Sequence, residues 1–156
     1  MDPDKWAGQM EDEIREREKA DAGKDEIFLA KRKLLDSQAP LLWKQLTRTL
    51  GDLARAYNKR RNILTVEDEG EQFAVRRNSD AGRVVLSAMF FHLENRIGLT
   101  MLPGDWFRNY HAKVIPGEGE GTACLVWDDP VTGQKSQRSI DEIATEAMEA
   151  VLKNRP

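Results

Sequence analysis

Cysteine and histidine, the residues on which many metal and catalytic sites depend, are scarce in this chain. Its 156 residues include one cysteine and two histidines. The lone cysteine, Cys124, excludes an intramolecular disulfide and a cysteine-rich metal site. It has no neighbouring histidine and no expected helix start beside it, so we expect a buried, unreactive thiol. The histidines do not have the spacing of a metal-binding motif, and we expect neither a metal nor a cofactor.

Long apolar runs are missing as well. Residues 1–26 contain no apolar stretch of the kind that a secretory signal has. Nowhere does the chain approach the roughly 18 continuous apolar residues of a membrane span. The formal net charge of −3 is too small to indicate nucleic acid or membrane as a partner by itself. We therefore expect a cytoplasmic protein that does not associate with membranes.

Charged residues, in contrast, are plentiful. They make up 33% of the chain, and hydrophobic residues make up 40%. This balance indicates a compact body with a charged extension, because an ordinary globular domain has fewer charges. We expect a charged helical extension at residues 1–39 and an α+β globular domain at residues 40–156, together forming one structural unit.

The first third of the chain has the pattern of charged helices. Residues 2–4 suit a helix start, and apolar side chains then recur at every fourth position. We expect a break near Ala22-Gly23. A second apolar stripe follows, and Pro40 should interrupt it because proline disfavours helical geometry at the preceding residue. The two stripes consist of Trp6, Met10 and Ile14, then Ile27, Phe28, Leu34 and Leu35.

The strongest helical pattern follows Pro40. Its apolar positions recur at intervals of three and four, which predicts a helix with one full apolar face. A basic segment at residues 58–62 complements the negative end of this helix. The apolar face consists of Leu42, Leu46, Thr49, Leu50, Leu53 and Tyr57.

From Ile63 onward the hydrophobic period changes to two, which is typical of strands. Connections of hairpin length, such as the turn at 78–82 and the glycine-rich, acidic connection at 116–121, predict an antiparallel meander of six to seven strands. The segment 83–93 is apolar on both sides, so we expect a central strand that is covered on both faces. The expected strands are 63–66, 72–77, 83–93, 97–101, 105–115, 122–127 and a short edge strand at 134–137.

The chain ends in an amphipathic helix. Ser139 and Glu142 have the spacing of a capping box, in which the serine caps the helix start. We expect this helix to pack on one face of the sheet. Its apolar stripe consists of Ile140, Ile143, Ala144, Ala147, Met148 and Val151.

Aromatic and polar residues alternate near the centre of the predicted sheet. One of the two alternating rows should line a groove on the sheet face that the last helix leaves open, and a groove of this kind could hold a small molecule. The same alternation also fits an ordinary core with a polar surface. The groove candidates are Phe91, His92, Trp106, Arg108, Tyr110 and His111.

Two further sites are conceivable. Either histidine could act as an acid–base group with a carboxylate such as Glu94 or Asp105. Residues 41–62 carry six basic residues and one acidic residue, so they could bind the phosphates of a nucleic acid. The acidic residues that follow, at 67–71, argue against this partner. The basic candidates are Arg55, Lys59, Arg60 and Arg61.

No set of residues defines a reaction, and we assign no catalytic residue. We expect a non-catalytic interaction module that forms a homodimer or binds another protein through its N-terminal helices, because their apolar residues exceed what one small sheet can cover. The alternatives are a small-molecule or lipid-like ligand binder that uses the open sheet face, a nucleic-acid binder, and a histidine-based enzyme.

Overall fold

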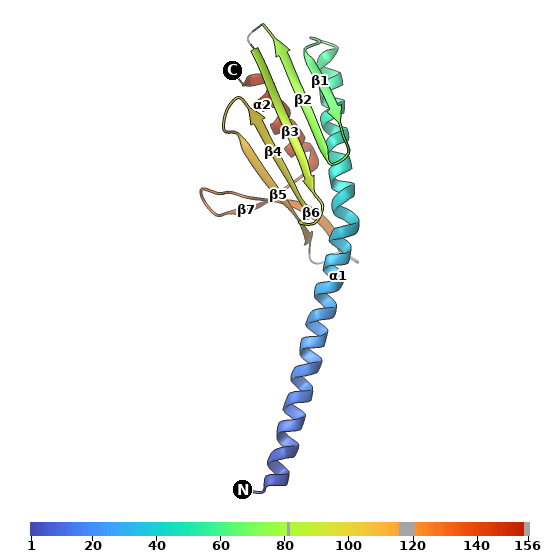
Figure 1. Cartoon of the computed structure of the whole chain (residues 1–156), viewed down its shortest axis with the longest axis vertical. Helices are drawn as coiled ribbons and strands as arrows, with labels where there is room; N and C mark the ends of the chain where they lie inside the picture. The colour runs from blue at the N-terminus through green and yellow to red at the C-terminus, as the bar shows by residue number, and fades with distance from the viewer. Residues whose placement is uncertain (81, 116–120, 155–156) are drawn as a thin grey trace. The chain divides into compact units, whose positions relative to one another are not determined.

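The computed structural model describes residues 1–80, 82–115 and 121–154. It has a long N-terminal helix, a seven-stranded sheet and a C-terminal helix (Figure 1), which confirms the α+β class. The elements are α1 (Pro3–Asn58), β1 (Leu64–Asp68), β2 (Gln72–Ser79), β3 (Gly82–Phe91), β4 (Arg96–Leu102), β5 (Phe107–Ile115), β6 (Thr122–Asp128), β7 (Lys135–Arg138) and α2 (Ile140–Lys153).

The strands lie in the sheet in the order in which they follow one another along the chain. Every neighbouring pair is antiparallel. The predicted meander is therefore confirmed, including the short edge strand at its end. Of the predicted connections, Ala81 and residues 116–120 lie outside the described residues.

Helix α1 runs without interruption from Pro3 to Asn58, so both predicted breaks are wrong. A helical glycine such as Gly23 costs only about 1 kcal/mol, and charged helix-forming residues on both sides continue the helix. Pro40 costs about 3 kcal/mol. However, Ala39 and Trp43, next to and one turn from this proline, are only 2% and 4% exposed. Their packing offsets the local cost of the proline.

Contacts along the chain define two compact units, Met1–Leu34 and Leu35–Pro156. In the first unit, every residue except Gly23 and Leu34 is exposed. The second unit contains the remainder of α1, the sheet and α2. Within the described ranges, no helix combines the length and the apolar character that crossing a membrane requires.

One face of the sheet carries the core of the second unit, and both helices lie on that face (Figure 1). Alternate residues of β3, from Val84 to Phe90, are buried there. Trp43 of α1 stacks on Phe90, with ring centroids 5.9 Å apart. The buried helix residues are Ala39, Trp43, Leu46, Leu50, Gly51 and Ala54 of α1, and Ile143, Ala144, Ala147, Met148 and Val151 of α2.

The opposite face, called the open face below, has none of the described helices packed on it. It carries the other alternate residues of β3, including Val85, Met89 and Phe91, and Met89 is 39% exposed. The expectation that this strand is covered on both faces is therefore wrong. Both amphipathic helices pack on the same side of the sheet, and residues 1–80, 82–115 and 121–154 provide no further layer for the other side.

Helix α2 packs on the sheet as predicted, and both of its ends are fixed. At its start, the hydroxyl of Ser139 accepts a hydrogen bond of 3.1 Å from the backbone N–H of Glu142. At its end, Arg77 of β2, which is only 6% exposed, donates to the carbonyl oxygens of Val151, Leu152 and Asn154 over 2.6–2.9 Å. The guanidinium thus satisfies helix carbonyls that have no partner within the helix.

Candidate functional site

The six groove candidates do not form one groove. Arg108 and Tyr110 point to the helix-covered face, because Tyr110 pairs with buried Ile97 of β4. Phe91 and His111 belong to the open face, where both are aligned with Arg96. His92 follows the end of β3, and Trp106 precedes β5. The alternation along these strands was correct, but it distributes the candidates over two faces.

Three of the candidates attach α2 to the sheet. The guanidinium of Arg108 lies 4.9 Å from the ring centroid of Trp106 and 5.0 Å from that of Trp127. Its Nε donates to Oε1 of Glu146 on α2 over 3.0 Å. Tyr110 is 1% exposed, and burial, followed by the nearby carboxylate of Glu146, raises the pKa of its hydroxyl from 10 to about 12. The contacts of these groups join α2 to the sheet.

A polar and aromatic network occupies the middle of the open face. The Arg96 guanidinium lies 3.8 Å above the ring of Phe91 and donates to Oδ1 of Asn109 over 3.0 Å. Nδ2 of Asn109 lies 3.2 Å from Nε2 of His111. A side chain at Gly98 would come within 3.3 Å of the Phe91 ring, so the glycine provides the space in which this ring lies. Such a stacked cation is a common way to cover an exposed ring.

His92 pairs with a carboxylate, but with Glu71 and not with the suggested Glu94 or Asp105. Nδ1 of His92 lies 2.9 Å from Oε1 of Glu71, and both side chains are more than half exposed. Glu94 instead accepts a hydrogen bond of 2.8 Å from Nε of Arg96. In the part of the chain that the structure describes, no group of three or more histidine, cysteine or acidic residues could hold a metal ion. Cys124 is half-buried, and burial raises the pKa of its thiol, which fits the expected low reactivity.

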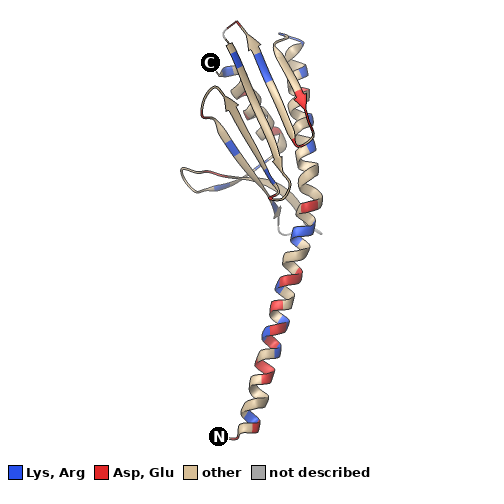
Figure 2. Cartoon of the chain, viewed as in Figure 1, with Lys and Arg blue, Asp and Glu red and all other residues tan. Residues whose placement is uncertain are grey.

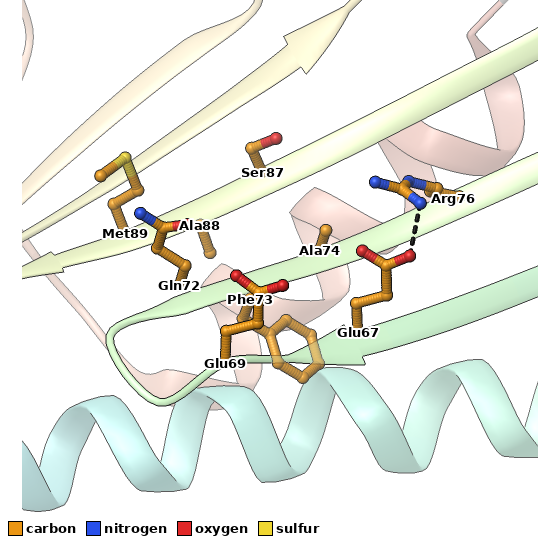
Figure 3. Close-up of a pocket in the computed structure, with 9 residues that line it drawn as sticks. All are labelled: Glu67, Glu69, Gln72, Phe73, Ala74, Arg76, Ser87, Ala88 and Met89. Atoms are coloured by element: carbon orange, nitrogen blue, oxygen red, sulfur yellow. Dashed lines mark hydrogen bonds and ion pairs between the residues drawn. The ribbon is translucent and has the colours of Figure 1, made fainter.

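Hollows lie around the end of β3 and the hairpin between β1 and β2. One of about 260 Å³ on the open face contains the ion pair of Glu67 with Arg76, whose charged groups face each other in Figure 3. Another, of about 400 Å³, lies between α1 and the hairpin. Trp43, buried beneath it, donates from Nε1 to the carbonyl of Gly70 over 2.6 Å. Of the six groove candidates, His92 lines the larger hollow.

The basic candidates lie at the end of α1. Arg55 forms an ion pair with Asp52 one turn earlier, and both side chains are largely exposed. Lys59, Arg60 and Arg61 are exposed as well. Among the acidic residues at 67–71, Glu67 pairs with Arg76 and Glu71 with His92. Binding of nucleic acid by this segment stays a prediction.

Six large apolar side chains of the first unit are exposed on α1. Charged residues of both signs surround them along this part of α1 (Figure 2). Leu29 belongs to this set and was missed in the sequence, because it lies outside the main helical stripe. It directly follows Ile27 and Phe28, and this run of three apolar residues could have indicated that Leu29 belongs to the same set. The set, called the helix 3–34 patch below, consists of Trp6, Met10, Ile14, Ile27, Phe28 and Leu29.

Comparison of the chain with protein-family models, with curated proteins and with solved structures finds no match.

Proposed function

We propose that this protein is a non-catalytic interaction module of the cytoplasm, which self-associates through the helix 3–34 patch. The observation that carries this proposal is the exposure of that patch. Its six large apolar side chains are 37–67% exposed in the single chain, and the residues around them are exposed as well.

Helix stability supports a partner for this segment. In water, most of the stability of a protein helix comes from packing one of its faces, and isolated helices are only marginally stable. The first unit has no core of its own, because all buried members of the core cluster belong to residues 39–151. Burying an apolar side chain of this size contributes about 1.5–3 kcal/mol. Pairing with a second copy would therefore stabilise the helix as well as the complex.

The solution mass tests the proposal. Light scattering at tens of micromolar should give twice the mass of one chain. Phe28→Asp should shift the mass toward that of one chain, because a buried carboxylate in an apolar contact is strongly unfavourable.

Leu102 provides the matched control. It is 67% exposed, like Phe28, but lies on β4. Leu102→Asp should leave the mass unchanged. If the unchanged chain has the mass of one chain, self-association is refuted. If only Leu102→Asp lowers the mass of the dimer to that of one chain, the interface lies on the sheet.

Small-molecule binding is the second candidate, and the hollow of about 400 Å³ favours it. This volume lies in the range of ligand pockets, and the hollow has the mixed lining that such pockets have. Trp43 lines it and would report binding of a fluorescent apolar probe by energy transfer. Thr47→Phe should fill the hollow and abolish that signal. Equal probe binding by both chains would argue against a ligand at this place.

A further inference from the structure

The hollow of about 400 Å³ between α1 and the β1–β2 hairpin has an apolar floor. Trp43 of α1 and Phe90 of β3 form this floor, and their rings stack with centroids 5.9 Å apart. Pro40 and Thr47 of α1 are half-buried beside them. The hydrogen bond from Trp43 to the carbonyl of Gly70 fixes the orientation of the indole. A compact apolar group can therefore lie in this hollow without rearranging the floor.

The charged side chains that line this hollow are mostly carboxylates. Asp68 and Glu71 belong to the hairpin, whereas Lys44 of α1 is the only cation among the lining residues that the structure describes. One oxygen of Glu71 lies 2.9 Å from Nδ1 of His92, and one oxygen of Asp68 accepts a hydrogen bond of 3.0 Å from the backbone N–H of Gly70. The described residues offer no donor to the second oxygen of either carboxylate, so each can accept a further hydrogen bond.

The two neighbouring hollows are acidic as well. The one of about 260 Å³ is lined by Glu67 and Glu69 (Figure 3), and a third, of about 250 Å³, is lined by Glu71 and Glu94. Glu67 and Glu94 each form an ion pair with an arginine. Among the described residues, Glu69 and Glu71 have no lysine or arginine paired with them. A cation is therefore attracted to this part of the molecule, and an anion is repelled.

We infer that the hollow of about 400 Å³ binds an organic cation, in the form of an amine carried on a compact apolar group. The apolar group lies on the floor of Trp43 and Phe90, and the ammonium group donates to the carboxylates of the hairpin. A ligand with a carboxylate could pair with Lys44, but it would meet Asp68 and Glu71 on the hairpin side. The inference rests on the second candidate function, to which it gives a ligand class, and it does not depend on self-association.

Three probes that share one aromatic ring separate the classes of ligand. At neutral pH phenethylamine is a cation, phenethyl alcohol is neutral and hydrocinnamate is an anion. Each is titrated into the full-length chain, and nitrogen–proton NMR follows the indole N–H of Trp43 and the backbone N–H groups of Gly70 and Glu71. Phenethylamine should give saturable shifts with about tenfold higher affinity than hydrocinnamate, because the reversed charge turns attraction into repulsion. Phenethyl alcohol should lie between them.

Substitutions at the two sides of the hollow should have opposite effects. Glu71→Gln should weaken phenethylamine binding by about two- to fivefold, which is the range of an exposed ion pair, and leave phenethyl alcohol unchanged. Lys44→Gln should strengthen phenethylamine binding by about twofold. Glu69→Gln is the matched control, because this side chain belongs to the same hairpin but lines the hollow on the open face (Figure 3). It should change the affinity by less than about twofold.

The outcomes separate the ligand class from ligand binding itself. Tightest binding of phenethylamine, weakened by Glu71→Gln and not by Glu69→Gln, supports the organic cation. Equal affinities of the three probes, tighter binding of hydrocinnamate, or equal effects of the two glutamate substitutions overturn the ligand class but leave small-molecule binding standing. If no probe gives saturable shifts, or if Thr47→Phe gives the same shifts as the unchanged chain, ligand binding in this hollow is overturned. Self-association is tested separately by the solution mass.

Discussion

At the scale of single residues, Arg77 is the side chain whose loss should lower the stability of the fold most. It is buried and satisfies the last carbonyl oxygens of α2 from a neighbouring strand. From the sequence it was indistinguishable from the half-buried Arg76 beside it, because its partners lie more than 70 positions further along the chain. A basic residue on a strand normally indicates a solvated surface, and only the tertiary structure assigns this one to a helix end.

Arg77→Met should lower the free energy of unfolding by about 2–4 kcal/mol, because it leaves buried carbonyl groups without a donor. Urea denaturation measures this loss. Arg83→Met, at an exposed position of β3, is the control and should change stability by less than about 0.5 kcal/mol. Equal effects of the two substitutions would contradict the role of Arg77.

Tyr110 should make stability fall at high pH. Its pKa is about 12 in the folded protein, where burial raises it from 10. A group whose pKa is raised by folding favours the protonated form, so its contribution is complete below pH 10. It decreases as the pH rises from 10 to 12, by up to about 2–3 kcal/mol.

Tyr110→Phe removes the ionisable hydroxyl and should remove this part of the pH dependence. The measurement is the urea midpoint of both chains at pH 8.5 and pH 11. The unchanged chain should lose more stability than Tyr110→Phe between the two values. Equal losses of stability in the two chains would show that folding does not raise the pKa of this hydroxyl.

At the scale of elements, the sequence predicted the strands and α2 well because each has a clear period of its own. It failed on α1, where the local signals at Gly23 and Pro40 indicated breaks. A local cost of a few kcal/mol cannot be weighed from sequence against packing, since the contact of Trp43 with Phe90 joins residues far apart in the chain. Trp43 itself was absent from the predicted apolar face.

The site was harder to predict than the fold. An alternating strand has two faces, and the period of two does not say which one a helix will cover. The choice for β5 was open from the sequence, and the structure places Tyr110 on the covered face and His111 on the open one. The pairing of His92 with Glu71 likewise depended on how the strands lie beside one another, which the sequence does not supply.

Pro40→Ala should stabilise the second unit. Alanine restores a backbone N–H donor and removes the clash of the proline ring with the preceding turn. The free energy of unfolding should rise by about 1–3 kcal/mol, because the greater conformational freedom of the unfolded alanine chain offsets part of the gain. Thermal and urea denaturation should both show the gain. The same substitution at Pro130, in an exposed turn, should give no gain. A loss at Pro40 would mean that its ring contributes more packing than the helix gains.

At the scale of the whole molecule, the two units should differ in how their stability depends on concentration. The core of the second unit is formed within one chain, whereas the first unit gains packing only from a partner if it self-associates. Binding between copies stabilises the bound form in proportion to the logarithm of concentration. Local opening should follow the same division.

Hydrogen exchange can detect this difference along α1. Amides of residues 7–34 should exchange quickly in dilute solution and become protected at tens of micromolar, while residues 43–54 stay protected throughout. The Phe28→Asp chain is the control and should show rapid exchange of the first segment at both concentrations. Protection of this segment in dilute solution would require a different source of its stability.

The position of Arg77 opposite the end of α2 has a consequence for biosynthesis. All seven strands pair with their neighbours in sequence, so hairpins can assemble one after another as the chain leaves the ribosome. The apolar side of the growing sheet, however, is closed only when Val151 and its neighbours emerge, after all seven strands. Until then the nascent polypeptide exposes the apolar face of its sheet, and the guanidinium of Arg77 lacks the carbonyl groups that it binds in the folded protein. The interval between the emergence of β7 and that of α2 is therefore when a chaperone would matter most to this protein.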